Sequence, residues 1–261
     1  MDGLEAVELK LSEVLIDNDS NRFDSEYFKK SYLQEDIYKF RYENIILGQI
    51  AFITDGQHGY HEVDDNSNIA HITAKNTRNW FADKLNVDML AKWVDEKNKR
   101  SSLKENDILL STRGTVGQCS LVTKEILPAN IDQDLVRICI LDDKLNPYYL
   151  LTYFNSKFGQ DWTLRNSTGM VQQGITIGKV KNCSIPILSV DTQISIERLV
   201  TYSYKKLEDS KRLYKEAEEL LLSELGLLDF VPNIDNITIK SFSDSFSVSG
   251  RLDSEYYQPK Y

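Results

Sequence analysis

The sequence predicts a mixed α/β (α+β) globular domain followed by one long α-helix that can form a coiled coil. Short β-type runs alternate with Gly, Asn and Asp turns between residues 47 and 186. Residues 191–228 contain no proline and one glycine, and are rich in Glu, Lys and Leu. RFDSEYF (22–28) returns as RLDSEYY (251–257), which indicates that the start of a domain is repeated. We therefore expect three parts: a domain at 1–190, a spacer and dimerisation helix at 191–228, and a linker with the beginning of a second, truncated copy at 229–261.

Composition indicates a globular and soluble chain. The 261 residues are 41% hydrophobic and 10% aromatic, which is enough for a sizeable core. No apolar run approaches the roughly 18 residues that span a bilayer, and the start lacks a signal-peptide profile, so we expect a cytoplasmic protein. Cys119, Cys139 and Cys183 are widely spaced without a C-x-x-C pattern, which favours core thiols over a disulfide or a zinc site.

The net charge of −9 argues at first against a nucleic-acid partner, because phosphate neutralisation needs Lys and Arg. Between residues 41 and 189, however, 17 basic residues balance 17 acidic ones. Within residues 146–189 there are four basic residues and one acidic residue. A locally basic face on an acidic protein is therefore compatible with the sequence.

Local signals predict the elements of the domain in chain order. Asp24 is suited to cap a helix over residues 24–40. The apolar positions of that helix recur at roughly helical spacing: Phe28, Tyr32, Ile37 and Phe40. Strands are predicted at IAHITA, DILLSTR, CSLVT and LVRICIL. NPYYLLTYFNS predicts a helix with Asn146 as its cap and Pro147 at its first position, where the missing N–H costs nothing.

Residues 191–228 predict a continuous helix, a rod of roughly 50 Å at about 1.5 Å per residue. Asp191 or Thr192 can cap it, and Gly226 can end it. One seven-residue series is large and mostly apolar, and the series four residues earlier is mostly small, which lets an antiparallel partner helix approach closely. The expected interface residues are Ile196, Val200, Leu207, Tyr214, Ala217, Leu221 and Leu228. The alternative is a long helix packed on its own domain.

Five stretches carry a family resemblance: STRGTVGQCSLV (111–122), PANIDQDLVRI (128–138), NPYYLLTYFNSKFGQ (146–160), STGMVQQGITIGKVKNCSIPI (167–187) and YKEAEELLLSELGL (214–227). In this order they resemble the specificity (S) subunits of type I restriction-modification systems. The resemblance covers nearly the whole chain. It implies a DNA target-recognition domain with a spacer helix, and it assigns catalysis to other subunits, so this chain is expected not to be an enzyme.

Such subunits usually hold two recognition domains, each followed by a long helix, and the two helices pair antiparallel. This chain resembles a first half that stops just after the second domain begins. Two chains are then expected to form a homodimer through their helices and read a palindromic split site. The implied partners are double-stranded DNA, a methyltransferase (modification) subunit and a translocase-nuclease (restriction) subunit, with no membrane. No cofactor is expected here, because S-adenosylmethionine, ATP and Mg belong to the partner subunits.

Four polar loops carry side chains that can read base edges or approach phosphates. They are TDGQHGY (54–60), TAKNTRNW (73–80), STRGTVG (111–117) and RNSTGMVQQGITIGK (165–179). The candidate DNA-binding residues are Gln57, His58, Tyr60, Lys75, Asn76, Arg78, Arg113, Thr115, Arg165, Asn166, Ser167, Thr168, Gln172, Gln173 and Lys179. Each loop can alternatively be an ordinary polar turn. Asn130 and Gln133 are expected to hold a neighbouring loop by hydrogen bonds.

Enzymatic and metal-binding alternatives find little support in the sequence. NPYY (146–149) approaches the Asn-Pro-Pro-aromatic motif of adenine methyltransferases, but it lacks the second proline and an upstream Gly-rich cofactor loop. His58, His61 and His71 lie within fourteen residues, but their Gly- and Asp-rich surroundings favour solvated or DNA-facing side chains. We therefore expect no metal. The competing functional hypothesis is a protein–protein module that binds modification subunits without reading DNA.

Overall fold

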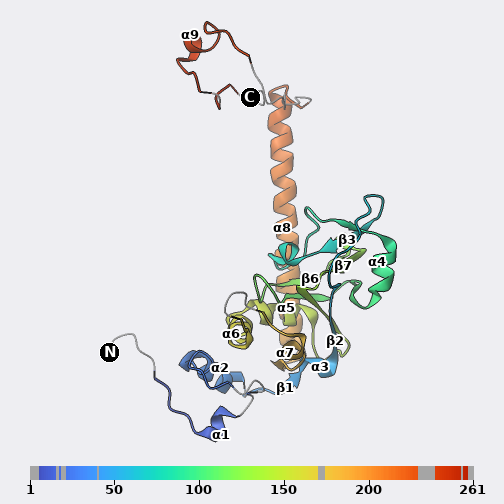
Figure 1. Ribbon diagram of the computed structural model, residues 1–261, viewed down its shortest axis with the longest axis vertical. Coiled ribbons are helices and arrows are strands. Elements are labelled where there is room, and N and C mark those ends of the chain that lie inside the picture. The colour runs from blue at the N-terminus through green and yellow to red at the C-terminus, as the bar shows by residue number, and fades with distance from the viewer. Residues whose placement is uncertain are drawn as a thin grey trace. The chain divides into compact units, whose positions relative to one another are not determined.

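The computed structural model describes residues 6–15, 18, 22–39, 41–169, 174–228, 239–253 and 255–257. The chain divides into two compact units, Met1–Thr201 and Tyr202–Tyr261. Among the described helices, none is both long and apolar enough to cross a bilayer. The mixed α/β class predicted from the sequence is confirmed (Figure 1).

The described residues of the first unit form nine strands in three sheets. A two-stranded sheet pairs β1 (Asn44–Ile46) with β9 (Ser184–Pro186). A four-stranded sheet has the order β2 (Ala51–Asp55), β8 (Leu135–Ile140), β5 (Ile108–Ser111) and β6 (Cys119–Leu121). A three-stranded sheet has the order β4 (Met89–Leu90), β3 (Ile69–Ile72) and β7 (Ala129–Ile131).

Helices and 3₁₀ turns connect these strands. The α-helices of the first unit are α1 (Leu11–Val14), α2 (Lys30–Lys39), α3 (Leu47–Ile50), α4 (Lys92–Lys97), α5 (Pro147–Asn155), α6 (Lys157–Asn166) and α7 (Ile177–Lys181). The 3₁₀ turns are η1 (Ala74–Thr77), η2 (Lys99–Ser101) and η3 (Lys124–Ile126). The predicted start of α5 is confirmed, because the Asn146 side chain accepts a hydrogen bond from the backbone N–H of Tyr148 and Pro147 is the first helical residue.

Both faces of the four-stranded sheet are buried at β5, which explains why this strand reads as an almost uninterrupted apolar run. Ile108 and Leu110 pack with helices α3, α5 and α7 in one core. Leu109, which points to the opposite face, packs with Ile72 and Ile131 of the three-stranded sheet in a second core. The alternation of strand side chains thus joins a helical layer, the four-stranded sheet and the three-stranded sheet.

The predicted helix over residues 24–40 is shorter than expected, since α2 begins only at Lys30. Asp24 accepts a hydrogen bond from the backbone N–H of Tyr27 at 3.2 Å, so it caps a turn that precedes the helix. Tyr32 is buried and Ile37 is exposed, so only part of the predicted apolar stripe contacts the core. Phe40 lies outside the described residues.

The repeated motif has the same local structure in both copies. Arg22 Nε donates to Asp24 at 2.7 Å, and Arg251 Nε donates to Asp253 at 2.7 Å. In each copy the aspartate accepts a backbone N–H three residues later, and the guanidinium lies over the ring of Tyr27 or Tyr256. Tyr27 is 4% exposed and Tyr256 is 47% exposed, so only the first copy is packed into a core.

Helix α8 (Val190–Glu224) has 35 residues and continues from the first unit into the second. Its cap is Ser189, whose hydroxyl accepts the N–H of Thr192 at 3.3 Å, so the prediction of Asp191 or Thr192 as cap was wrong by two or three residues. Gly226 ends the helix as predicted: its φ is +67°, and Leu227 N–H bonds to the carbonyl of Leu222 at 2.8 Å. The short helix α9 (Phe246–Ser249) follows in the second unit.

Candidate nucleic-acid interface

Sheet topology brings three of the four predicted loops to one edge of the domain. Strands β2 and β5 both pair antiparallel with β8, so both end beside its start, with Asp55 opposite Val136 and Ser111 opposite Leu135. Strand β3 runs parallel to β7, with Ile72 opposite Ile131. Because β7 leads into β8 through residues 132–134, the loops after β2, β3 and β5 all begin around this turn.

Backbone hydrogen bonds hold these loops together, and the fourth loop joins them. Gln57 N–H bonds to the carbonyl of Ile131 at 3.1 Å, and Thr112 N–H bonds to the carbonyl of Asp134 at 2.8 Å. Gly174 of the fourth loop pairs with both Arg113 and Thr168. We call the combined surface the loop edge, and define it as residues 54–60, 73–80, 111–115, 132–134, 168–169 and 174–176.

One glycine makes this close approach possible. A Cβ atom on Gly56 would lie 2.0 Å from the carbonyl oxygen of Ile131, which no side chain tolerates. Gly59 has a φ of +81° and turns the chain back toward the sheet. The glycines of TDGQHGY therefore shape the first loop.

Seven of the predicted DNA-binding residues have exposed side chains on the loop edge: His58, Tyr60, Lys75, Arg78, Arg113, Thr115 and Thr168. Tyr60 is 89% exposed. The His58 ring lies 2.7 Å from a carboxylate oxygen of Asp55, and Arg100 contacts the other oxygen at 2.8 Å. Burial acts to raise the pKa of Asp55, but its hydrogen bonds to His58 and Arg100 hold the pKa below its usual range.

Several other predicted residues are committed to contacts inside the domain. Asn76 is 4% exposed and bonds to Thr73, Asp83 and Leu85. The Gln57 side chain donates to the carbonyl of Tyr60 at 2.8 Å, and Ser167 is buried against the carbonyl of Thr163. Asn166 is half-buried and donates to the carbonyl of Trp162 at 2.9 Å. These side chains shape the loops and do not project from them.

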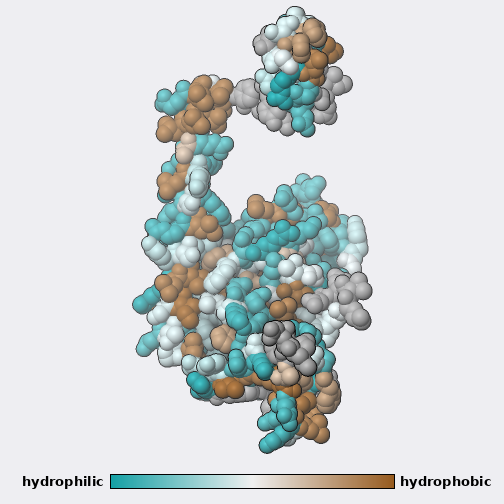
Figure 2. All heavy atoms as spheres, turned by 90° about the vertical axis from the view of Figure 1, so that its left-hand side faces the viewer, coloured by the Kyte–Doolittle hydropathy of each residue, from teal (hydrophilic) through white to brown (hydrophobic). Residues whose placement is uncertain are grey.

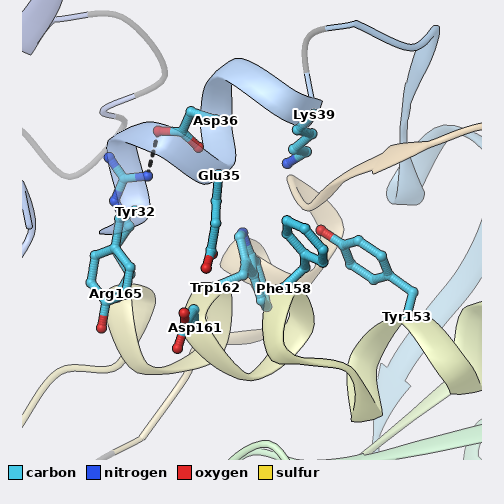
Figure 3. Close-up of a pocket in the computed structure, with 9 residues that line it drawn as sticks. All are labelled: Tyr32, Glu35, Asp36, Lys39, Tyr153, Phe158, Asp161, Trp162 and Arg165. Carbon is cyan, nitrogen blue, oxygen red and sulfur yellow. Dashed lines mark hydrogen bonds and ion pairs between the residues drawn. The ribbon is translucent and has the colours of Figure 1, made fainter. Parts of the chain in front are cut away.

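Arg165 is likewise turned inward, toward α2 (Figure 3). Its guanidinium pairs with Asp36 at 2.7 Å and lies 4.4 Å from the ring centre of Tyr27, and its Nε donates to the Tyr27 carbonyl. Figure 3 shows α2 and α6 facing each other across the side chains of Glu35, Asp161 and Trp162. Arg165 therefore anchors the N-terminal segment, and the prediction that it contacts DNA does not fit its position.

The remaining predicted residues lie in α7, in β7 and the turn before β8, or outside the described part of the chain. Lys179 lies in the short helix α7 and is half-buried. Gln172 and Gln173 lie outside the described residues. Asn130 is buried and donates to Asp95 at 2.8 Å, which confirms that it holds a neighbouring segment, whereas Gln133 lines a hollow of the loop edge with Arg113 and Thr168.

The loop edge has mixed charge. Lys75, Arg78 and Arg113 stand against Asp55, Asp132 and Asp134, and Arg113 lies 3.5 Å from Asp134. Burial raises the pKa of Asp132 to about 6, so this carboxyl loses part of its charge in mildly acidic solution. Trp80 of the TAKNTRNW loop, which is not among the predicted DNA-binding residues, is exposed and offers a large aromatic surface. An aromatic residue within a polar loop was the signal that could have identified it.

A layered α/β scaffold that gathers loops from several strands at one edge defines a class of protein: a recognition module whose specificity resides in its loops. Within this class the chain has a family. Residues 41–219 match the family of the type I restriction modification DNA specificity domain, and the chain belongs to that family.

Three relatives illustrate the similarity. The type I restriction enzyme EcoBI specificity subunit of Escherichia coli is 28% identical over 111 residues, which are 42% of this chain and 23% of that protein. The S subunit structure from M. genitalium has a TM-score of 0.50 and 14% identity, over 69% of this chain and 43% of that one. The HsdS structure from Thermoanaerobacter tengcongensis has a TM-score of 0.45 and 17% identity, over 77% and 51%. The chain thus spans about half of these relatives' length or less.

Proposed function

We propose that this chain reads one half of a split DNA site for a type I restriction-modification complex, through its loop edge. Two observations support the proposal together: the family match over residues 41–219, and the convergence of the predicted loops at the turn 132–134. In such an interface, contacts to phosphates position the duplex and contacts to base edges specify its sequence.

The exposed side chains of the loop edge suit distinct parts of a DNA duplex. Arg113 and Lys75 can donate to guanine O6 and N7, or to phosphate oxygens. Thr115 and Thr168 can donate and accept hydrogen bonds at base edges, and Tyr60 and Trp80 supply apolar contact. Arg78 projects from the same loop as Lys75. The buried amides and the Asp55–Arg100 pair hold these groups in place.

We also propose that two copies pair through α8. The predicted residues Ile196 and Val200 do not take part, because Ile196 is partly buried and Val200 is buried in the core of their own domain. The predicted residue Leu228 lies beyond Glu224, where α8 ends. Within the later turns of α8, exposed pairs of leucine or tyrosine lie seven residues apart at 213–214 and 220–221. Figure 2 shows apolar side chains, in brown, gathered on the C-terminal part of α8. With Leu207 and Ala217, these residues form the α8 face, an exposed stripe suited to a coiled coil.

In the proposed complex the catalytic steps belong to the partners. A methyltransferase subunit, bound beside the recognition domain, flips an adenine out of the duplex and methylates it with S-adenosylmethionine. A translocase-nuclease subunit uses ATP and Mg. This chain supplies the sequence readout and the spacing of the two half-sites, whereas S-adenosylmethionine, ATP and Mg bind to the partner subunits.

Selection from randomised DNA duplexes tests the readout. The chain in complex with its modification subunit should enrich a split motif, and Arg113→Ala should weaken binding to that motif at least about 10-fold, since a good base contact contributes ~1–3 kcal/mol. Lys144→Ala is the matched control, because exposed Lys144 follows β8 at the end away from the loop edge, and it should change binding less than about twofold. If no motif is enriched, the chain is a protein–protein module instead.

A further inference from the structure

Three potential metal ligands meet beside the first recognition loop. His61 lies in the segment after β2, His71 is in β3, and Asp88 directly precedes β4. One ligand atom from each lies within 4.8 Å of the others. His61 Nε2 is 3.5 Å from a carboxylate oxygen of Asp88, and the rings of His61 and His71 have centres 4.0 Å apart.

Backbone hydrogen bonds bring these residues together independently of any side-chain contact. His71 N–H bonds to the carbonyl of Asp88 at 2.9 Å, within the pairing of β3 with β4. The segment that carries His61 pairs with β4 as well, since Val63 lies opposite Leu90 and Asp64 N–H bonds to the carbonyl of Met89 at 2.8 Å. The cluster is therefore built into the three-stranded sheet.

His71 supplies a second, separate observation. Its side chain is 5% exposed, and its Nε2 is the one buried side-chain nitrogen or oxygen without a hydrogen-bond partner among the described residues. A buried polar atom without a partner is rare and calls for an explanation such as a bound ion.

We propose that His61, His71 and Asp88 bind one divalent transition-metal ion, and that zinc fits them. Two imidazoles and a carboxylate are ordinary zinc ligands, and a three-residue set leaves a fourth position for water. With bonds of about 2.0–2.1 Å, two ligands at the tetrahedral angle lie ~3.4 Å apart, close to the observed separation of His61 and Asp88. Small side-chain movements would bring His71 to the same distance.

This site differs from the group of histidines that the sequence suggested. His58 pairs with Asp55 and is not part of it. Asp88 completes the set from a distant position in the sequence, which spacing alone did not indicate. The expectation of no metal concerned only His58, His61 and His71 and did not consider Asp88.

The metal would fix the first recognition loop to the sheet. His61 is directly joined to Tyr60, whose exposed ring is stacked with that of His61 at 6.3 Å between centres. A bound ion at His61 thus orders the residues that present Tyr60 and His58 at the loop edge. This consequence for DNA binding rests on the proposed function, whereas metal binding itself does not.

Titration of the full chain with zinc and cobalt, after purification in a chelator, tests the site directly. We expect saturable binding of one zinc ion per chain by calorimetry, and cobalt absorption bands of a low-symmetry site. Asp88→Asn and His61→Gln, both at residues that are at least partly exposed, should weaken zinc binding at least 10-fold while the circular dichroism is unchanged. His71→Ala should abolish zinc binding. If this variant does not fold, Asp88→Asn and His61→Gln still test the site.

His58→Ala is the matched control, as a nearby histidine outside the set, and should keep zinc affinity within about twofold. The proposal is overturned if no saturable binding occurs up to about 100 µM zinc. It is also overturned if His58→Ala removes binding while Asp88→Asn keeps it, which would indicate adventitious surface binding. Because these titrations contain no DNA, a failure of DNA recognition leaves their result unaffected.

Discussion

At the scale of single residues, Arg137 and Asp107 form a buried ion pair at 2.6 Å between β8 and the turn before β5. Asp107→Ala would leave the guanidinium without its charge partner in the core, which typically costs about 3–5 kcal/mol. We expect the free energy of unfolding in urea to fall by that amount. Asp143→Ala, at an exposed turn, should change it by less than about 0.5 kcal/mol. A loss below about 1 kcal/mol for Asp107→Ala would contradict the assigned role.

A second residue-scale prediction concerns pH. Burial raises the pKa of Asp132 from 3.8 to about 6, so the folded state holds a proton that the unfolded state releases between these values. Stability therefore falls as pH rises from about 4 to 6 through this group. Asp132→Asn keeps the oxygen that accepts Asp134 N–H and removes the buried charge. Allowing for partial exposure, we expect a gain of about 1–2 kcal/mol at pH 7.5.

The measurement is the difference in unfolding free energy between the Asp132→Asn variant and the unchanged chain, taken at intervals from pH 3.5 to pH 8. The difference should be small at pH 3.5, where Asp132 is mostly protonated in both states, and should reach its full size above about pH 7. A difference that does not vary with pH would show that the carboxyl titrates normally.

At this scale the sequence showed which residue types could contact DNA, but not whether their side chains point outward or into the domain. Arg113 and Arg165 were equal candidates, yet Asp36 and Tyr27 hold Arg165 inside the domain, while Arg113 stays at the surface. Asn76 was predicted to contact DNA and is buried as a structural amide. The outcome depends on tertiary partners that lie far away in sequence, so local pattern alone did not reveal it.

At the scale of elements, α8 packs against the domain with its first turns and exposes an apolar face on its later turns, and one seven-residue series runs through both parts. Its first turns are fixed to the domain, because Gln193 bonds to the carbonyls of Lys144 and Leu188 and Val200 is buried in the core. Its later turns carry the exposed α8 face. The seven-residue series runs through both parts without a break, so the sequence did not show where packing against the domain ends.

The α8 face should hold the proposed dimer together. Leu221→Lys places a charge in the stripe and should weaken self-association at least about 10-fold, as measured by sedimentation equilibrium, because a buried lysine is strongly disfavoured. Ser223→Lys, two residues away on the opposite side of the helix, adds the same charge and should leave association unchanged. Equal effects of the two variants would contradict pairing through this face.

Helix length should set the distance between half-sites. Inserting seven residues into the middle of α8 keeps the apolar face in phase and adds ~10.5 Å at about 1.5 Å per residue. At about 3.4 Å per base pair, the preferred spacer should lengthen by about three base pairs. Sequencing of the motif methylated in cells measures the spacer, and an unchanged spacer would refute the role of the helix as a ruler.

At the scale of the whole molecule, the order of elements was largely predictable and the surface was not. The four predicted strand segments and the helix begun by Asn146 and Pro147 are confirmed, because burial on both faces and capping leave clear local signals. The meeting of the loops at the turn 132–134 depends on strand pairing between distant segments. The cluster of His61, His71 and Asp88 depends on the same kind of pairing.

The most direct test of the central claim is a genome-wide map of N6-methyladenine in cells that express the modification subunit with and without this chain. We predict a split palindromic motif that is methylated only when the chain is present. The Arg113→Ala variant should reduce or relax methylation of that motif, and Lys144→Ala should not. Methylation that is identical with and without the chain would contradict its role as a DNA-reading subunit.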